Sequence, residues 1–159
     1  MALPRSPPVA DIPVDPTPSG GTPVIRVVAA LIVDESGRVL LVRKRGTTAF
    51  MQPGGKPEAG ETDAAALARE LDEELSLRLD PDTFDYLGRF ETQAANEHGH
   101  DLVAEVFSVA ISAPVVVAAE IEEFAWVDLT DPGQLTVAPL TRDFMQPFIS
   151  KLSEAIRRP

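Results

Sequence analysis

The sequence predicts an α/β (α+β) fold in which a mixed β-sheet lies between helices. Runs of β-branched and aromatic residues recur along the chain and are separated by turn residues. One segment in the middle and another near the C-terminal end repeat their apolar residues at helical spacing instead. Strands that are interrupted by one helix and closed by another are typical of a sheet covered by helices.

A proline-rich arm, residues 1–23, is expected to precede a single domain at 24–159. Seven of the 15 prolines fall in the first 23 residues. Proline removes backbone donors and this segment has few apolar groups to bury, so we expect an extended or disordered arm. A dispensable tail fits this composition, and so does a segment that packs on its own domain or on the partner subunit of a homodimer.

Two strands are expected to open the domain. Residues 24–33 (VIRVVAALIV) have the composition of a buried strand, and residues 39–44 (VLLVRK) that of the returning strand. The turn between them is DESG, 34–37. Residues 45–55 are interrupted by glycine and proline and are expected to form a loop.

The central helix is expected from about Thr62 to Leu75. At about 100° per residue, its apolar side chains fall within one stripe that would face the core. The stripe consists of Ala64, Leu67, Ala68, Leu71 and Leu75.

The second half of the domain is expected to add strands and a final helix. The strand signals lie at 84–93, at 102–111 after a turn at 96–101, and at 122–129. Residues 140–158 repeat apolar side chains at helical spacing. Pro147 lies inside this segment and is expected to kink the helix or delay its start.

The composition excludes several classes of function. The net charge of -11 argues against a basic surface for nucleic acid. The absence of cysteine excludes disulfides, zinc–thiolate sites and thiol nucleophiles. The apolar runs are far shorter than the roughly 20 residues that span a bilayer, and the N-terminal residues do not resemble a signal peptide. We therefore expect a soluble cytoplasmic protein with neither a nucleic-acid nor a membrane partner.

Three carboxylates lie beside the apolar stripe of the central helix. Glu70, Glu73 and Glu74 fall in one adjoining arc, where like charges at helical spacing repel. Converging carboxylates are the ligands that Mg²⁺ or Mn²⁺ prefers, whereas zinc favours histidine or cysteine. From spacing alone, a cation site and a solvated acidic face both remain open.

The residues around this arc resemble the Nudix box, G-x5-E-x7-R-E-U-x-E-E-x-G-U, in which U is aliphatic. Eight of the nine specified positions match: Gly55, Glu61, Arg69, Glu70, Leu71, Glu73, Glu74 and Leu77. Ser76 stands where the family has glycine. It is expected to cost about 1 kcal/mol in a left-handed helix end or to change that geometry. The chain is similar to Nudix hydrolases over residues 24–157, which implies an α/β/α sandwich.

The resemblance also implies roles for the box residues. Glu70, Glu73 and Glu74 match the family's metal-binding positions, and the carbonyl of Gly55 is a further candidate ligand. Arg69 is expected to point away from the arc and to orient Glu61 or a neighbouring carboxylate. Together these glutamates and the arginine form the expected catalytic set, with Mg²⁺ as cofactor and Mn²⁺ as its substitute.

Residues outside the box are weaker candidates for substrate binding. Arg43 and Arg45 project from one side of the second strand and Lys44 from the other. These basic side chains either steer phosphate or are simply solvated. Phe50 and Met51 either flank a nucleobase or pack in the core.

An additional general base is expected outside the helix. Glu120, Glu122 and Glu123 lie where Nudix enzymes often carry a further acidic residue, and the sequence does not choose among them. His98 and His100 in the expected 96–101 turn either reach the site or face solvent.

The expected partner is a small-molecule nucleotide. Two secondary signatures of Nudix subgroups are missing: a proline near Gln93, typical of ADP-ribose hydrolases, and a tyrosine at 94–96, typical of dinucleoside-polyphosphate hydrolases. Elimination favours a (d)NTP pyrophosphohydrolase that releases NMP and pyrophosphate. The alternatives are hydrolysis of another NDP-linked compound, such as a dinucleoside polyphosphate or a nucleotide sugar, and a non-catalytic regulatory module that binds nucleotides.

Overall fold

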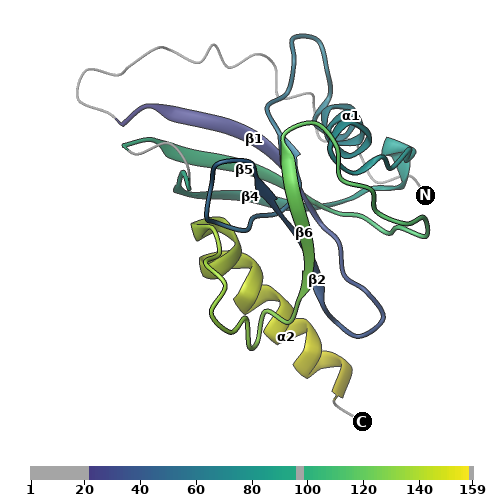
Figure 1. Cartoon of the computed structure of the whole chain (residues 1–159), viewed down its shortest axis with the longest axis vertical. Helices are drawn as coiled ribbons and strands as arrows, with labels where there is room; N and C mark the ends of the chain where they lie inside the picture. The colour runs from purple at the N-terminus through teal and green to yellow at the C-terminus, as the bar shows by residue number, and fades with distance from the viewer. Residues whose placement is uncertain (1–21, 96–98, 158–159) are drawn as a thin grey trace.

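The computed structural model describes residues 22–95 and 99–157, with side chains as far as residue 151. A four-stranded sheet of order β3-β1-β5-β4 and a two-stranded sheet of order β2-β6 lie between two helices (Figure 1). The strands are β1 Val24–Leu31, β2 Val39–Lys44, β3 Gly54–Gly55, β4 Asp85–Gln93, β5 Asp101–Ser108 and β6 Ile121–Val127. The helices are α1 Asp63–Leu75 and α2 Gln146–Arg157, with a 3-10 turn at Pro81–Thr83 and a π-helical turn at Thr141–Met145.

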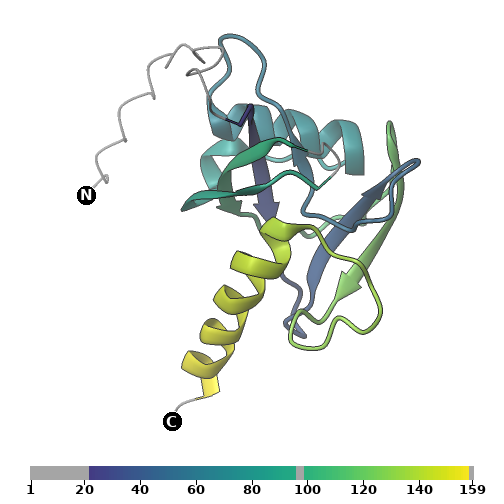
Figure 2. The same ribbon diagram turned by 90° about the vertical axis from the view of Figure 1, so that its left-hand side faces the viewer.

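The two helices cover opposite faces of the sheets, which confirms the predicted α/β/α sandwich (Figures 1 and 2). In β1, Val28 and Ala30 pack toward α1, whereas Ala29 and Leu31 pack toward α2. The strand pairs in parallel with β5. A central parallel strand is buried on both faces, which explains why its sequence is a continuous apolar run rather than an alternating one.

Strand β3 was not expected, because residues 45–55 have the composition of a loop. Gly54 and Gly55 pair with Ala29 and Val28 of β1. A Cβ on Gly54 would lie 2.0 Å from the carbonyl oxygen of Val28, so only glycine permits this approach. The other strands agree with the predicted segments to within three residues at each end.

Helix α1 begins and ends close to where the sequence predicts. Thr62 caps its start, and the Thr62 hydroxyl accepts a hydrogen bond from the amide of Ala65 at 3.1 Å. Ser76 follows the last turn in the left-handed conformation, at φ 58°. Its hydroxyl donates to the carbonyl of Val116 at 3.1 Å. Serine therefore keeps the geometry usual for glycine, and the hydrogen bond offsets part of its strain.

We expect Ser76→Gly to change the free energy of unfolding by less than about 1 kcal/mol, because it removes both the strain and the hydrogen bond. Ser76→Ala keeps the strain and loses only the bond, so it should be less stable than either. Urea unfolding of the three proteins measures this order. Equal stability of the alanine and glycine variants would show that the serine conformation carries no strain.

Helical backbone begins at residues 139–140, before Pro147, and a π-helical turn rather than a delayed start precedes the proline. In this turn the amide of Gln146 donates to the carbonyl of Thr141, five residues earlier. Helix α2 begins at Gln146. Pro147 therefore lies in the first turn of α2, where its missing donor is tolerated.

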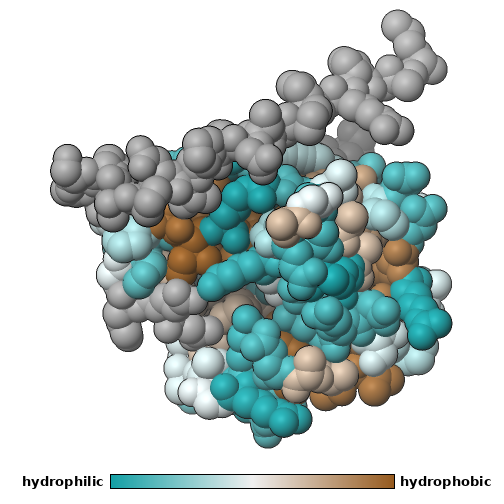
Figure 3. Space-filling model, turned by 90° about the horizontal axis from the view of Figure 1, so that it is seen from above, coloured by the Kyte–Doolittle hydropathy of each residue, from teal (hydrophilic) through white to brown (hydrophobic). Residues whose placement is uncertain are grey.

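The predicted arm at 1–23 falls almost entirely outside the described residues, and it stays a prediction. Within the described ranges no helix has both the length and the apolar character needed to cross a membrane. The face in Figure 3 is mainly hydrophilic, with smaller hydrophobic areas between the polar side chains.

Candidate active site

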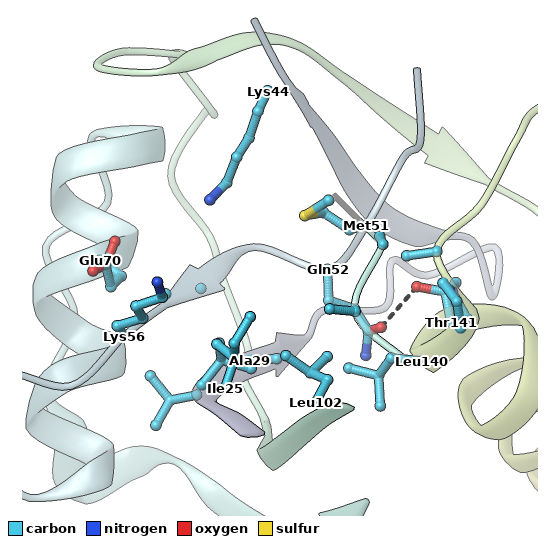
Figure 4. A pocket seen from close by; sticks show the side chains of 18 of the residues that line it. Ile25, Ala29, Lys44, Met51, Gln52, Lys56, Glu70, Leu102, Leu140 and Thr141 are labelled. Atoms are coloured by element: carbon cyan, nitrogen blue, oxygen red, sulfur yellow. Dashed lines mark hydrogen bonds between the residues drawn. The ribbon is translucent and has the colours of Figure 1, made fainter. Parts of the chain in front are cut away.

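A cavity of about 470 Å³ lies between α1, β1 and the start of the C-terminal helical segment. Figure 4 shows its two ends. Charged side chains lie toward α1, and apolar side chains lie toward β5 and the π-helical turn. The charged end contains Lys44, Lys56, Glu70 and Glu120 with the backbone of Gly54 and Gly55, and the apolar end contains Ile25, Ala29, Leu102 and Leu140.

Two carboxylates of α1 lie against the backbone of β3. Glu74 is 2% exposed; its Oε2 accepts from the amide of Gly54 at 3.3 Å, and its Oε1 has no hydrogen-bond partner within residues 22–95 and 99–157. The Glu70 carboxyl lies so close to Gly55 that a Cβ there would be 2.5 Å away. Glycine at this position is therefore required by the close packing of backbone and carboxylate.

The electrostatics of this pair reflect its burial. Burial raises the pKa of Glu74 to about 8, and the charge of Glu70 adds to the effect. Burial also raises the pKa of Glu70, although hydrogen bonding from Arg69 opposes this. Removal from water therefore disfavours the charged form of both carboxyls, and more strongly that of Glu74.

Arg69 joins the loop before α1 to the acidic arc. Its Nε and Nη2 donate to the two carboxylate oxygens of Glu61 at 2.8 and 2.9 Å, which lowers the pKa of Glu61. Its Nη1 donates to Glu70 at 3.0 Å and to Glu73 at 3.3 Å. The guanidinium thus contacts Glu61 but also reaches into the arc, whereas the sequence placed it facing away.

Glu73 differs from its two neighbours. Its side chain is 53% exposed and is held by Arg69. Among residues 22–95 and 99–157, no three acidic or histidine side chains already converge in an arrangement that could hold a metal ion. The three glutamates share one helix edge, but only Glu70 and Glu74 lie together against β3.

The residues still fit a divalent cation. The unpartnered Oε1 of buried Glu74 is an orphaned acceptor, and Glu70 supplies a second carboxylate beside it. An all-oxygen donor set suits Mg²⁺ or Mn²⁺ rather than zinc. A cation there would stabilise the charged forms of the two carboxyls, which burial disfavours.

The structure separates the basic and acidic candidates of β2 and β6. Lys44 lines the cavity and forms an ion pair with Glu120, which also lines it, at 3.3 Å. Ala119, just before this glutamate, is held at φ 53°, a left-handed conformation that is uncommon for alanine. The amide of Arg45 donates to the Glu120 carbonyl at 2.9 Å, so the backbone of Glu120 is held beside β2.

The remaining charged candidates lie elsewhere. Arg43 pairs with Glu123 at 2.9 Å and Arg45 with Glu122 at 3.4 Å, across β2 and β6. None of these four side chains lines the cavity. At this end of β2, where the register shifts between Arg43 and Lys44, Lys44 thus lines the cavity and its two arginine neighbours do not.

The aromatic, methionine and histidine candidates also differ in whether they line the cavity. Phe50 is 7% exposed and packs in the core on the α2 side, whereas Met51 lines the cavity. His98 lies outside the described residues, and His100 does not line the cavity.

Sequence reasoning missed Gln52 and Thr141. Gln52 is 6% exposed and Thr141 is fully buried, and both line the cavity. The Thr141 hydroxyl donates to Gln52 Oε1 at 2.8 Å, while Gln52 Nε2 has no hydrogen-bond partner in the part of the chain that the structure describes. The sequence does show a polar residue, Gln52, between Met51 and the Pro-Gly-Gly turn. No spacing rule, however, predicts its contact with Thr141, which lies 89 positions later.

Comparison with known proteins agrees with this geometry. Residues 23–151 match the family model of the NUDIX domain. The crystal structure of a MutT protein from Methanosarcina mazei Go1 superposes with a TM-score of 0.66 at 26% identity, covering 88% of this chain and 100% of that one.

Two curated relatives match over parts of their length. An 8-oxo-dGTP diphosphatase of Haemophilus influenzae is 41% identical over 58 residues, which are 34% of this chain and 43% of that protein. An octanoyltransferase of Myxococcus xanthus is 38% identical over 116 residues, 67% of this chain and 32% of that protein. The chain thus spans less than half the length of either relative.

Proposed function

This chain belongs to the Nudix hydrolase family, and on that premise we propose that it is a Mg²⁺-dependent pyrophosphohydrolase of nucleoside diphosphates linked to a further group. A (d)NTP is the proposed substrate, with NMP and pyrophosphate as products. The relative named 8-oxo-dGTP diphosphatase supports this choice of substrate class.

One observation carries the proposal. A buried glutamate, Glu74, keeps an unpartnered carboxylate oxygen beside Glu70, at the charged end of a cavity whose other end is apolar. Unpartnered buried acceptors are rare because they are destabilising. A cation bound by the two carboxylates would pair this oxygen and attract the phosphates of a nucleotide, although the protein as a whole is acidic.

The residues divide the work of hydrolysis. Glu70 and Glu74 would hold Mg²⁺, with Glu73 at the same helix edge; when bound, the ion neutralises phosphate charge and acidifies water. Lys44 and Glu120, which both line the cavity, are the proposed phosphate-binding group and the proposed base that accepts a proton from the attacking water. Arg69 holds Glu70 in position.

The reaction is balanced by one water molecule. Water adds to phosphorus at the α,β linkage, and the bridging P–O bond breaks. The base accepts a proton from the water, and NMP and pyrophosphate are released. No nucleophile of the protein and no redox partner is needed.

A substrate panel tests this proposal. Ribo- and deoxynucleoside triphosphates, dinucleoside polyphosphates and nucleotide sugars are incubated with Mg²⁺ or Mn²⁺, and the products are separated by chromatography. NMP and pyrophosphate from triphosphates is the expected result. Turnover confined to another NDP-linked class would overturn the proposed substrate, and tight nucleotide binding without turnover of any compound would indicate a regulatory module.

A further inference from the structure

The apolar end of the cavity holds an unpaired hydrogen-bond donor. Gln52 is 6% exposed, and its Nε2 has no partner among the described residues. Figure 4 shows the amide group of this residue on the cavity wall, on the side of Leu102 and Leu140. A buried donor without an acceptor is destabilising, so its retention in an apolar wall requires an explanation.

Thr141 determines which end of the amide stays unpaired. Its hydroxyl donates to Gln52 Oε1 at 2.8 Å, so the buried Nε2 is the end without a partner among the described residues. Thr141 is fully buried and begins the π-helical turn, so its hydroxyl is held in a packed environment. The unpaired end of the Gln52 amide is therefore a donor and not an acceptor.

The segment that carries Gln52 is anchored on both sides. The amide of Ala30 in β1 donates to the Pro53 carbonyl at 2.9 Å, and the amide of Ala138 donates to the Phe50 carbonyl at 2.8 Å. These bonds tie the backbone around Gln52 to the sheet and to the segment before Thr141. The donor is thus held in place before any ligand arrives, as selective recognition requires.

The surroundings fit a flat heterocycle. Ile25, Ala29, Leu102 and Leu140 line this end, and the charged end with Lys44 and Glu70 lies across the same cavity. Ligand sites typically combine apolar walls with a few polar groups that fix orientation. A nucleotide with its phosphates at the charged end would place its base beside Gln52.

We propose that Gln52 selects nucleotides whose base presents a carbonyl oxygen to its Nε2. Uracil, thymine and guanine carry such an oxygen where cytosine and adenine carry an amino group. A carbonyl accepts the hydrogen bond, whereas an amino group would place donor against donor. This inference rests on the proposed function, because it assumes that the cavity binds a nucleotide.

The test compares substrates that differ at this position. In the native protein kcat/KM is expected to be at least roughly tenfold higher for UTP than for CTP, and for GTP than for ATP. Gln52→Met keeps the size but removes the donor, so both ratios should fall to about one. Gln52→Glu replaces the amide donor and should shift the ratios toward CTP and ATP.

Two further variants separate recognition from packing. Thr141→Val keeps the shape but frees the Gln52 amide to rotate, so the ratios should fall here too. Gln134→Met is the matched control, because Gln134 is exposed and lies outside the cavity, and it should keep the native ratios. Circular dichroism melting of each variant reports folding separately.

The outcomes distinguish this inference from the proposed function. Hydrolysis of all four triphosphates at equal kcat/KM would overturn base selection and leave the proposed function standing. A Gln52→Met protein with a lower melting temperature and unchanged ratios would show that the amide is structural, which also overturns it.

If no nucleotide is hydrolysed, the proposed function fails, and binding still decides the inference. Calorimetry with UMP, CMP, GMP and AMP without metal measures base selection directly. A roughly tenfold preference for UMP over CMP and for GMP over AMP supports the role of Gln52. Equal affinities, or no binding, overturn it.

Discussion

Glu74→Gln is expected to lower turnover by at least about a hundredfold at saturating Mg²⁺ and to stabilise the metal-free protein. Substitution of groups that merely support metal ligands costs about 10- to 100-fold, so loss of a ligand should exceed this range. The glutamine keeps the shape and its Oε1 can accept from the Gly54 amide, while the buried charge is removed.

The gain in stability comes from the same carboxyl. Burial raises the pKa of Glu74 to about 8, so ionising it in the folded protein is unfavourable. The variant should therefore melt at a higher temperature than the native protein at pH 8.5 in EDTA, and at nearly the same temperature at pH 5. Loss of activity together with a gain in stability is typical of a functional site in which a charged group is kept although it destabilises the fold.

Two comparisons make this result specific. Glu35→Gln removes an equal charge from an exposed turn and should leave both turnover and melting temperature near the native values. Near-native turnover of Glu74→Gln at saturating Mg²⁺ would contradict the assignment of Glu74 to the metal site.

The second large effect is the pH dependence of stability without metal. The pKa of Glu74 is about 8 in the folded protein against 4.5 for an ordinary glutamate. Between these values the unfolded chain has lost the proton that the folded protein keeps. The free energy of unfolding should therefore fall as the pH rises from about 4.5 to about 8, by roughly 3–5 kcal/mol, and then level off.

Divalent metal should reverse this loss. A cation at a hundred times its Kd that binds only the folded protein adds about 2.7 kcal/mol. The stabilisation should be larger at pH 8.5 than at pH 6, because binding requires the ionised carboxylate. Mn²⁺ should act at lower concentration than Mg²⁺, because Mg²⁺ gives up its bound waters more reluctantly.

Melting curves in EDTA, MgCl₂ and MnCl₂ across this pH range measure both effects. NaCl at equal ionic strength controls for simple screening of the acidic surface. If MgCl₂ does no more than matched NaCl at every pH, the carboxylates of α1 form only a solvated acidic edge.

Local spacing was enough to predict much of the molecule. The apolar stripe and Thr62 predicted α1, and period-two alternation along β2 separated Lys44 from Arg43 and Arg45. The family resemblance rested on side chains at fixed intervals within one helix and the loop before it. Each of these features depends on the direction of neighbouring side chains, which the period of a helix or strand defines.

Only the tertiary structure decided which side chains at the edge of α1 are buried. Glu74 is buried because a distant segment closes over the end of α1: the amides of Val116 and Ala118 donate to the carbonyls of Leu75 and Glu74. Glu73, one residue earlier in the chain, remains exposed beside Arg69. Spacing places both on the edge of the helix, but burial depends on residues about 40 positions away.

The apolar end of the cavity depends even more on long-range contacts. Gln52 meets Thr141 across 89 residues, and β3 forms only because Gly54 fits against the backbone of β1. Neither residue pair has a periodic signature, since the segments involved are a loop and an irregular helical turn. Hydrogen bonds between distant segments brought them together, and this information is absent from any single stretch of sequence.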